Sequence, residues 1–137
     1  MKELGGLTVM KNHWKSQGVD LTGMVIHDGS GLSPRNSVTP RQLAHILKLA
    51  QQHETGTLFE KSLPLAGRSG TLISFGNGRT LEGRVRAKSG GMSRVRTYAG
   101  YLTKRSGQRY AFALMTNNFL SNPKNDMVKF LDALIQK

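Results

Sequence analysis

The feature that most restricts the fold is a pair of largely apolar and aromatic runs near the C-terminus, joined by a short polar turn. The runs cover Tyr98 to Thr103 and Gln108 to Thr116, and the residues between them, Lys104-Arg105-Ser106-Gly107, are polar and end in glycine. Two strands separated by so short a turn pair as antiparallel neighbours. The sequence therefore predicts a hairpin, and the rest of the fold must be built around it.

A third strand is predicted before this hairpin. Residues Leu81 to Lys88 alternate, which places Val85 and Ala87 on one face and basic side chains on the other. The basic members of this stretch are Arg84, Arg86 and Lys88. Two interpretations of this cationic face stay open: a charge concentrated for an anionic ligand, or a strand edge that is protected by charge against aggregation.

Helices are predicted on both sides of the strands in the chain. Leu7 to Gln17 has the apolar spacing of a helix, with Leu7, Met10 and Trp14 on one face. Thr39 and Gln42 form a capping box around Pro40, which opens a helix that ends near His53. The buried side chains expected of this helix are Leu43, Ile46, Leu47 and Ala50, and those of a last helix, opened by Asn122-Pro123, are Met127, Phe130, Leu131 and Leu134. A short turn is expected from Leu58 to Lys61.

The length of 137 residues suits one domain. Helices, then strands, then a helix predict an α+β fold in which an antiparallel sheet is flanked by helices. The chain has no cysteine, which excludes disulfides, Cys-type zinc sites and cysteine nucleophiles. The four histidines are scattered without ligand spacing, so no metal and no cofactor is expected.

Charge is the most unusual bulk property. Twenty Lys and Arg against eight Asp and Glu give a net charge of +12, which favours anionic partners. Nucleic acid is not the expected partner, because aromatic residues do not interleave with the basic ones and no groove-reading motif is present. No apolar run reaches the length of a membrane span, and the first residues do not form a signal peptide.

Two segments have the composition of a binding site. The loop from Asp28 to Asn36 gathers a carboxylate, hydroxyls and an amide among glycines, although turns use the same residues. Lys88-Ser89-Gly90-Gly91 is expected at the end of a strand. There the lysine would supply charge, the hydroxyl a directed hydrogen bond, and the glycines close access to the backbone for a carboxylate.

In their order along the chain, these segments resemble the D-alanyl-D-alanine carboxypeptidases of DacB type, which are low-molecular-mass penicillin-binding proteins of class C. The matching stretches are Asp28-Gly29-Ser30-Gly31-Leu32-Ser33 with Asn36 and Thr39-Pro40, then Ser62 to Gly67, Gly70-Thr71-Leu72, Gly83 to Gly90, Ala99-Gly100-Tyr101 and Asn117-Asn118. The resemblance covers about Leu7 to Leu134 and is more specific than any one motif.

The resemblance implies part of a penicilloyl-serine-transferase (beta-lactamase-like) fold and a serine-type peptidase. Such an enzyme cuts D-Ala-D-Ala bonds or D-amino-acid cross-links of peptidoglycan stem peptides through an acyl-serine, and it binds beta-lactam antibiotics. It implies a periplasmic or other extracytoplasmic location for the parent enzyme. The balance between carboxypeptidase and endopeptidase activity stays open.

The same resemblance assigns roles to residues. Ser33 and Lys88 would be catalytic, with Ser33 in the proton relay and Lys88 directing charge toward the relay and the substrate carboxylate. Asn36 would bind the substrate amide; the spacing from Ser33 to Asn36 is one residue longer than the usual Ser-x-Asn, so Ser30 stays an alternative to Ser33. Substrate binding would also involve Ser89, Gly90 and Gly91, the last through a backbone N–H of the oxyanion hole.

The nucleophile is where the chain departs from the family pattern. The family carries Ser-x-x-Lys upstream of its other motifs, and here the spacing occurs only at Ser121-Asn122-Pro123-Lys124, after them. We interpret Ser121 as a chance match. Residues 1–137 are therefore expected to be the C-terminal part of the transpeptidase-like domain, to need the missing N-terminal part of the same polypeptide, and to be inactive alone. The alternative is a non-catalytic domain that binds peptidoglycan or another anion.

Overall fold

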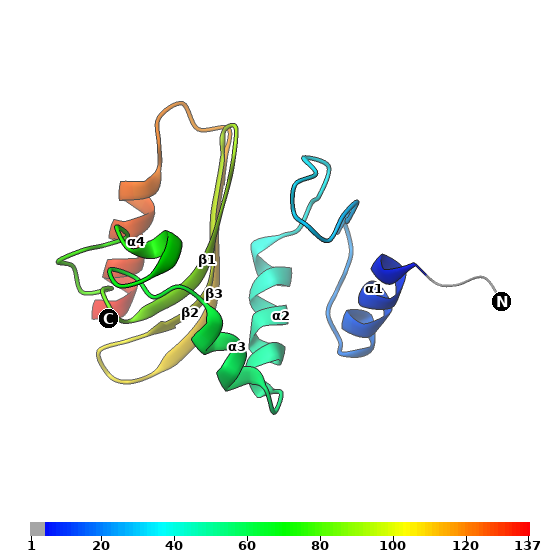
Figure 1. The fold of residues 1–137 in the computed structure, drawn as a ribbon, viewed down its shortest axis with the longest axis horizontal. Coiled ribbons are helices and arrows are strands. Elements are labelled where there is room, and N and C mark those ends of the chain that lie inside the picture. Colours follow the sequence, from blue (N-terminus) through cyan, green and yellow to red (C-terminus); the bar gives the residue numbers. More distant parts are fainter. Residues whose placement is uncertain (1–4) are drawn as a thin grey trace.

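The computed structural model describes residues 5–137. Within this range it contains helices on both sides of a three-stranded sheet (Figure 1). The elements are α1 (Gly6–Ser16), α2 (Pro40–Gln52), α3 (Gly56–Ser62), η1 (Gly70–Leu72, a 3-10 turn), β1 (Val85–Met92), β2 (Val95–Thr103), β3 (Arg109–Asn117) and α4 (Lys124–Gln136). This is the α+β arrangement with an antiparallel sheet that the sequence predicted. No helix among these residues is long and apolar enough to cross a membrane.

The sheet has the order β1-β2-β3, and both pairings are antiparallel. The predicted hairpin is confirmed: the N–H of Lys104 donates to the carbonyl of Gln108 at 2.8 Å, and Gly107 takes a φ of 86° at the tight corner. Glycine adopts this left-handed conformation without the steric cost that a side chain would add.

The first strand begins four residues later than predicted. Leu81 to Arg84 form a turn, closed by the N–H of Arg84 donating to the carbonyl of Leu81 at 3.0 Å, and Gly83 has a φ of 71°. Strand β1 then runs through both glycines to Met92. Lys88 consequently lies in the middle of the strand, not at its end.

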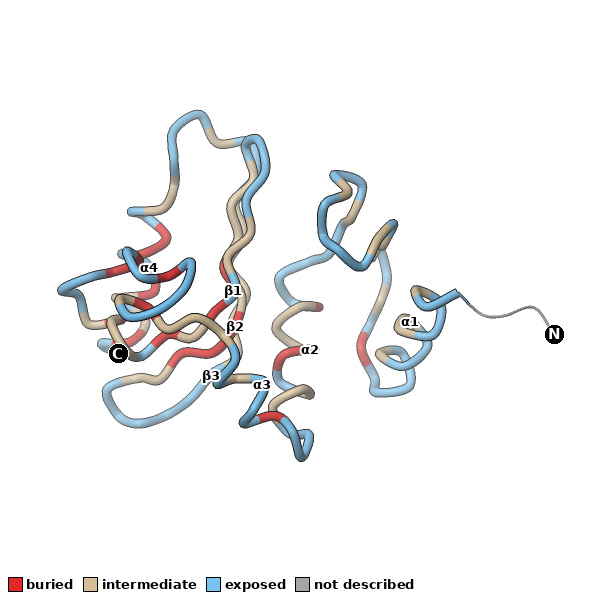
Figure 2. Tube along the Cα trace, in the orientation of Figure 1, coloured by how far each residue is buried: buried red, intermediate tan, exposed pale blue. Residues whose placement is uncertain are grey.

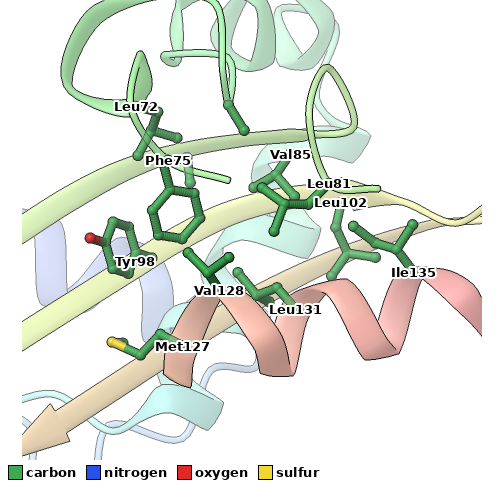
Figure 3. Close-up of a cluster of buried hydrophobic side chains, with 12 residues drawn as sticks. Leu72, Phe75, Leu81, Val85, Tyr98, Leu102, Met127, Val128, Leu131 and Ile135 are labelled. Atoms are coloured by element: carbon green, nitrogen blue, oxygen red, sulfur yellow. The ribbon is translucent and has the colours of Figure 1, made fainter. Parts of the chain in front are cut away.

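The main core lies between the sheet and α4. It contains Val85 and Ala87 of β1, Tyr98 and Leu102 of β2, and side chains from the 72–81 segment (Figure 3). Helix α4 contributes Met127, Val128, Leu131 and Ile135. The prediction that Phe130 is buried was wrong: its side chain is 53% exposed. The buried face of α4 runs instead through the neighbouring positions Val128 and Leu131.

Helix α2 packs on the opposite face of the sheet, against β3 and β2 (Figure 1). Its predicted capping box is present: Thr39 Oγ1 accepts from the N–H of Gln42 at 3.2 Å, and Gln42 Oε1 accepts from the N–H of Thr39 at 2.9 Å. Of the four apolar side chains predicted to be buried, Leu47 is buried and the others are partly so.

Two polar contacts fix α2 in place. The buried Tyr101 hydroxyl of β2 donates to the carbonyl of Leu47 at 2.7 Å. The buried Gln42 amide donates to the carbonyls of Asp20 and Thr22, at 2.9 and 3.0 Å. These contacts join the sheet, α2 and the segment before α2 into one unit. Most buried positions lie on the α4 side, whereas α1 contains no buried residue (Figure 2). Leu7, Met10 and Trp14, the predicted apolar face of α1, are only partly covered.

Candidate functional site

The loop between α1 and α2 is organised by the carboxylate of Asp28. That carboxylate accepts hydrogen bonds from the N–H of Gly31 at 3.0 Å, the N–H of Ser33 at 2.9 Å, the hydroxyl of Ser30 at 3.1 Å and the Asn36 amide at 2.7 Å. The Asn36 bond, the largest cause, and the other donors hold the pKa of Asp28 below its ordinary value. The loop is closed at its base by a two-way backbone bridge between Val25 and Ser37, at 2.9 and 2.8 Å.

The Asn36 side chain is largely used inside this loop. Its Oδ1 accepts from the N–H of His27 at 2.7 Å and from the N–H of Asp28 at 3.4 Å, while its Nδ2 donates to Asp28. A primary amide has two N–H donors, so one of them is left for a ligand. The substrate contact that the sequence suggests for Asn36 stays a prediction, and in the structure its side chain shapes the loop.

Both candidate serines of the loop have local contacts. The Ser33 hydroxyl is partly buried and accepts from the N–H of Arg35 at 3.2 Å. The Ser30 hydroxyl is exposed and is engaged by Asp28 and by the N–H of Leu32, which donates to it at 3.3 Å. The Ser33 hydroxyl keeps its proton free for another acceptor, whereas that of Ser30 is donated to Asp28.

The second candidate segment lies on β1, an edge strand of the sheet. The first part of this edge is covered, because Ala66 donates to the carbonyl of Val85 at 2.9 Å and Ala87 donates to the carbonyl of Pro64 at 3.0 Å. From Lys88 to Met92 no backbone bond on that side is found within residues 5–137. An extended ligand could therefore pair with this part of the edge.

Lys88 and Ser89 point to opposite faces of the sheet. The Ser89 hydroxyl donates to Thr71 Oγ1 of η1 at 2.9 Å, on the side of Val85, Ala87 and the core. Lys88 is exposed on the other side, and its ammonium donates to the carbonyl of Ser89 at 2.7 Å. Thr71 was not singled out as a ligand from the sequence, since nothing in the spacing of positions 71 and 89 predicts their contact.

Gly90 and Gly91 leave space that neighbouring side chains fill. A Cβ on Gly90 would lie 2.5 Å from Thr97 Oγ1, and a Cβ on Gly91 would lie 2.9 Å from Arg96 Nη1. Both neighbours belong to β2, where Thr97 and Arg96 are the register partners of the two glycines. The glycines therefore admit these side chains next to the backbone of the open edge.

The predicted cationic face does not concentrate charge at one point. The guanidinium group of Arg86 donates to the carbonyl of Leu63 at 3.1 Å and that of Arg84 donates to the carbonyl of Lys104 at 3.4 Å. Each of these arginines thus holds a neighbouring segment. Lys88 is the member of the set whose charge remains beside the open edge.

The Asp28 loop and the Lys88 side chain lie on the same side of the sheet. Lys88 shares its face with Tyr101 of β2, whose hydroxyl reaches α2, and the Ser33 loop leads directly into α2. Figure 1 shows this loop on the α2 side of the strands. The hydroxyl-bearing loop and the exposed ammonium of Lys88 thus lie on one side of the sheet. Groups of these kinds can serve proton transfer and anion binding.

Ser121 has no relation to this arrangement. Its spacing partner Lys124 donates from Nζ to Ser74 Oγ at 3.1 Å. Helix α4 begins at Lys124, whose N–H donates to Asn122 Oδ1 at 3.1 Å. A serine nucleophile needs its base within hydrogen-bond reach. Within residues 5–137, no group of three or more His, Cys, Asp or Glu side chains could hold a metal ion.

Comparison with known proteins gives a consistent result. The model of the D-Ala-D-Ala carboxypeptidase 3 (S13) family matches residues 3–135. The chain is 35% identical to carboxypeptidase DacB of Mycolicibacterium smegmatis, over 83% of this chain and 26% of the relative. It is 37% identical to a D-alanyl-D-alanine carboxypeptidase of Actinomadura sp. strain R39, over 82% of this chain and 22% of the relative. The chain thus spans about a quarter of the length of these curated relatives.

Solved structures of the same kind share the fold. Penicillin-binding protein 4 (DacB) from Haemophilus influenzae superposes with a TM-score of 0.83 and 26% identity, over 96% of this chain and 32% of that one. The sheet, its flanking helices and the order of motifs all agree with the resemblance noted in the sequence. The chain belongs to the D-Ala-D-Ala carboxypeptidase 3 (S13) family.

Proposed function

We propose that this chain forms the substrate-binding C-terminal part of a serine-type D-Ala-D-Ala carboxypeptidase/endopeptidase that acts on peptidoglycan stem peptides. The observation that carries the proposal is the open edge of β1 from Lys88 to Met92, with the Ser33 loop on the α2 side of it. A substrate peptide would pair with this edge, as extended ligands do with exposed strands. The parent enzyme would work outside the cytoplasm, where peptidoglycan lies.

In this proposal some residues serve the proton relay and others bind the substrate. Ser33 relays a proton toward the leaving D-alanine, Lys88 supports that relay with its charge, and the remaining N–H of Asn36 donates to a substrate carbonyl. Ser89 binds the terminal carboxylate, and the backbone at Gly90 and Gly91 lies close to the scissile carbonyl, where the N–H of Gly91 contributes to the oxyanion hole. Ser30 is the alternative to Ser33.

The nucleophile is proposed to come from a Ser-x-x-Lys segment that precedes these residues in a longer polypeptide. The serine oxygen would attack the carbonyl carbon, its proton would pass to the base, and the leaving D-alanine nitrogen would receive a proton; water would then hydrolyse the acyl-serine. The same serine would be acylated by beta-lactams. A structure of Haemophilus influenzae penicillin-binding protein 4 in complex with a novel beta-lactam, which superposes on this chain with a TM-score of 0.79 and 29% identity, supports this extension.

Two measurements on the chain test the proposal. Incubation with a fluorescent penicillin followed by mass spectrometry of the intact protein should show no covalent label, and label on Ser121 or another serine would contradict the assignment of the nucleophile. N-acetyl-D-Ala-D-Ala should bind in preference to N-acetyl-L-Ala-L-Ala, with weaker binding after Lys88→Ala. Lys129→Ala, an equal change of charge at an exposed position of α4, is the control.

A non-catalytic domain that binds peptidoglycan is the second candidate. The observation that favours it is the open edge of β1 with the exposed Lys88 beside it, since a peptide can pair with such an edge without a nucleophile. Addition of the upstream part of the parent polypeptide separates the two candidates. Restored release of D-alanine supports the peptidase, whereas peptide binding without release supports the binder.

A further inference from the structure

Arg96 is an arginine of the sheet whose guanidinium group has no described partner. Its Nε is buried and has no hydrogen bond within residues 5–137, and the ion pair found there joins Arg109 and Glu60. The neighbouring arginines differ, because the side chains of Arg84, Arg86, Arg94 and Arg105 each donate to a carbonyl or a hydroxyl. A buried Nε–H without an acceptor is costly, since this donor loses its water and gains no hydrogen bond in return.

The position of Arg96 places this group beside the open edge. Arg96 on β2 is the register partner of Gly91 on β1, and its Nη1 lies 2.9 Å from the point where a Cβ on Gly91 would be. The guanidinium group therefore covers Gly91 from the core side of the sheet. A larger side chain at position 91 would push it away from the strand.

Ser89 lies on the same face of β1, two residues before Gly91. Its hydroxyl is hydrogen-bonded to Thr71 Oγ1 at 2.9 Å, so two hydroxyl groups adjoin the strand next to the guanidinium group. Tyr98 is the register partner of Ser89, and Arg96, two residues before Tyr98 on β2, is the partner of Gly91, so Arg96 and Ser89 lie on the same face one pair apart. The positive charge of Arg96 also opposes the rise that burial causes in the pKa of Tyr98.

Lys88 cannot supply charge to this face in the same way. It projects to the α2 side of the sheet, whereas Ser89, Thr71 and Arg96 lie on the side of η1 and α4. The Lys88 ammonium reaches the strand edge from the α2 side and is engaged there by the carbonyl of Ser89, whereas the hydroxyls of Ser89 and Thr71 lie on the core side. A carboxylate that binds at the Ser89 hydroxyl therefore has Arg96, and not Lys88, as the cation on its own face.

We propose that Arg96 binds the terminal carboxylate of the ligand, together with the hydroxyl groups of Ser89 and Thr71. This inference rests on the proposed function and extends it: Lys88 serves the relay on the α2 side, and Arg96 recognises the chain end on the other side. The planar guanidinium group can donate two parallel hydrogen bonds to a carboxylate, which an ammonium cannot. The ligand class is a peptide with a free C-terminal carboxylate.

Binding of N-acetyl-D-Ala-D-Ala and of its C-terminal amide to the chain tests this assignment. Isothermal titration should give the free carboxylate a tighter Kd than the amide, and Arg96→Gln should reduce that preference about tenfold, which corresponds to about 1.4 kcal/mol. Arg96→Lys should retain part of the preference for the carboxylate, because lysine keeps the positive charge but cannot donate two parallel hydrogen bonds. Arg105→Gln, which removes the same charge at an exposed position away from β1, is the control and should leave the preference unchanged.

A second readout follows the Arg96 side chain directly. In an NMR titration of the unmodified chain, the Nε–Hε signal of Arg96 should shift with the carboxylate peptide and stay in place with the amide. The assignment is overturned if Arg96→Gln keeps its fold, judged by circular dichroism, and retains the full preference for the carboxylate. It is also overturned if neither peptide binds or the Nε–Hε signal does not move.

Failure of the proposed function has a different signature. If the carboxylate preference depends on Arg96 but N-acetyl-L-Ala-L-Ala binds as well as the D-peptide, the Arg96 site stands and the D-Ala-D-Ala assignment falls. If the D-peptide is preferred and Arg96→Gln leaves the preference for the carboxylate unchanged, the proposed function is supported and the assignment of Arg96 is wrong.

Discussion

The hydroxyl of Tyr101 offers a sharp test of how α2 is held against the sheet. It donates to the carbonyl of Leu47 at 2.7 Å in a buried setting, and Tyr101→Phe removes this bond without removing the ring. The edge-to-face contact with Phe59, at a centroid distance of 6.4 Å, survives in the variant. The change therefore isolates one hydrogen bond between the sheet and α2.

The expected loss of stability in Tyr101→Phe depends on whether the carbonyl of Leu47 keeps another hydrogen-bond donor. Leu47 lies inside α2, so its carbonyl retains its helical acceptor role after the substitution and is not left without a donor. The expected loss is therefore the net value of one hydrogen bond, about 1 kcal/mol, and not the larger penalty of an orphaned buried group. For a chain of 137 residues this corresponds to a fall in Tm of about 3–4 °C.

Urea unfolding followed by circular dichroism measures the free energy of unfolding directly. Tyr98→Phe is the matched control: it lies three residues away on β2, its ring is equally buried, and its hydroxyl has no described hydrogen bond. The control should be close to neutral. Equal losses in both variants, or a loss above about 3 kcal/mol for Tyr101→Phe, would refute the view that this bond adds one ordinary contact.

Further outcomes are expected for two glycines, for Asp28 and for Tyr98. Gly100→Ala should lower the free energy of unfolding severely, because the new Cβ would clash with the carbonyl oxygen of Arg86 on β1. Gly107→Ala should lower it by only about 1 kcal/mol, because its Cβ would contact nothing within 4 Å and only the φ of 86° is unfavourable. Thermal melts of the two variants measure the difference. Asp28→Asn should raise amide hydrogen exchange at Gly31 and Ser33 and leave core amides unchanged. Because hydrogen bonds lower the pKa of Asp28 in the fold, the unmodified loop should keep its order above the ordinary pKa and lose it as the pH falls through the lowered one, seen as chemical-shift changes by NMR. Burial raises the pKa of Tyr98 above its ordinary value, so its contribution to stability is present below about pH 10 and is lost as the pH rises further; Tyr98→Phe should flatten the alkaline part of the unfolding free energy curve.

Local signals in the sequence predicted the elements well. The capping box at Thr39 and the polar turn ending in Gly107 fix backbone geometry through contacts a few residues apart, and both are present. The start of β1 was misjudged because alternation alone cannot distinguish a strand from a turn that places Leu81 in the core. Phe130 was misjudged because the apolar spacing of a helix does not fix which positions at the border of its apolar face are buried.

The site was predicted only in part, for a related reason. The segments around Ser33 and Lys88 carry recognisable motifs, and their roles remain predictions. The contacts of Ser89 with Thr71 and of Gly91 with Arg96 depend on how η1 and β2 lie beside β1. Such pairings are tertiary, and no spacing within the chain encodes them. The division of Lys88 and Ser89 between two faces also required the strand register.

The stretch from Pro64 to Ala66 gives the open strand edge a direction. It already occupies the hydrogen-bonding side of Val85 and Ala87, so a polypeptide laid along β1 can continue outward past Met92 but meets occupied backbone just before Lys88. A ligand that pairs with this strand therefore loses its backbone hydrogen bonds at that point. In the proposed function, this would favour a peptide whose free end lies beside Lys88, where the pairing ends.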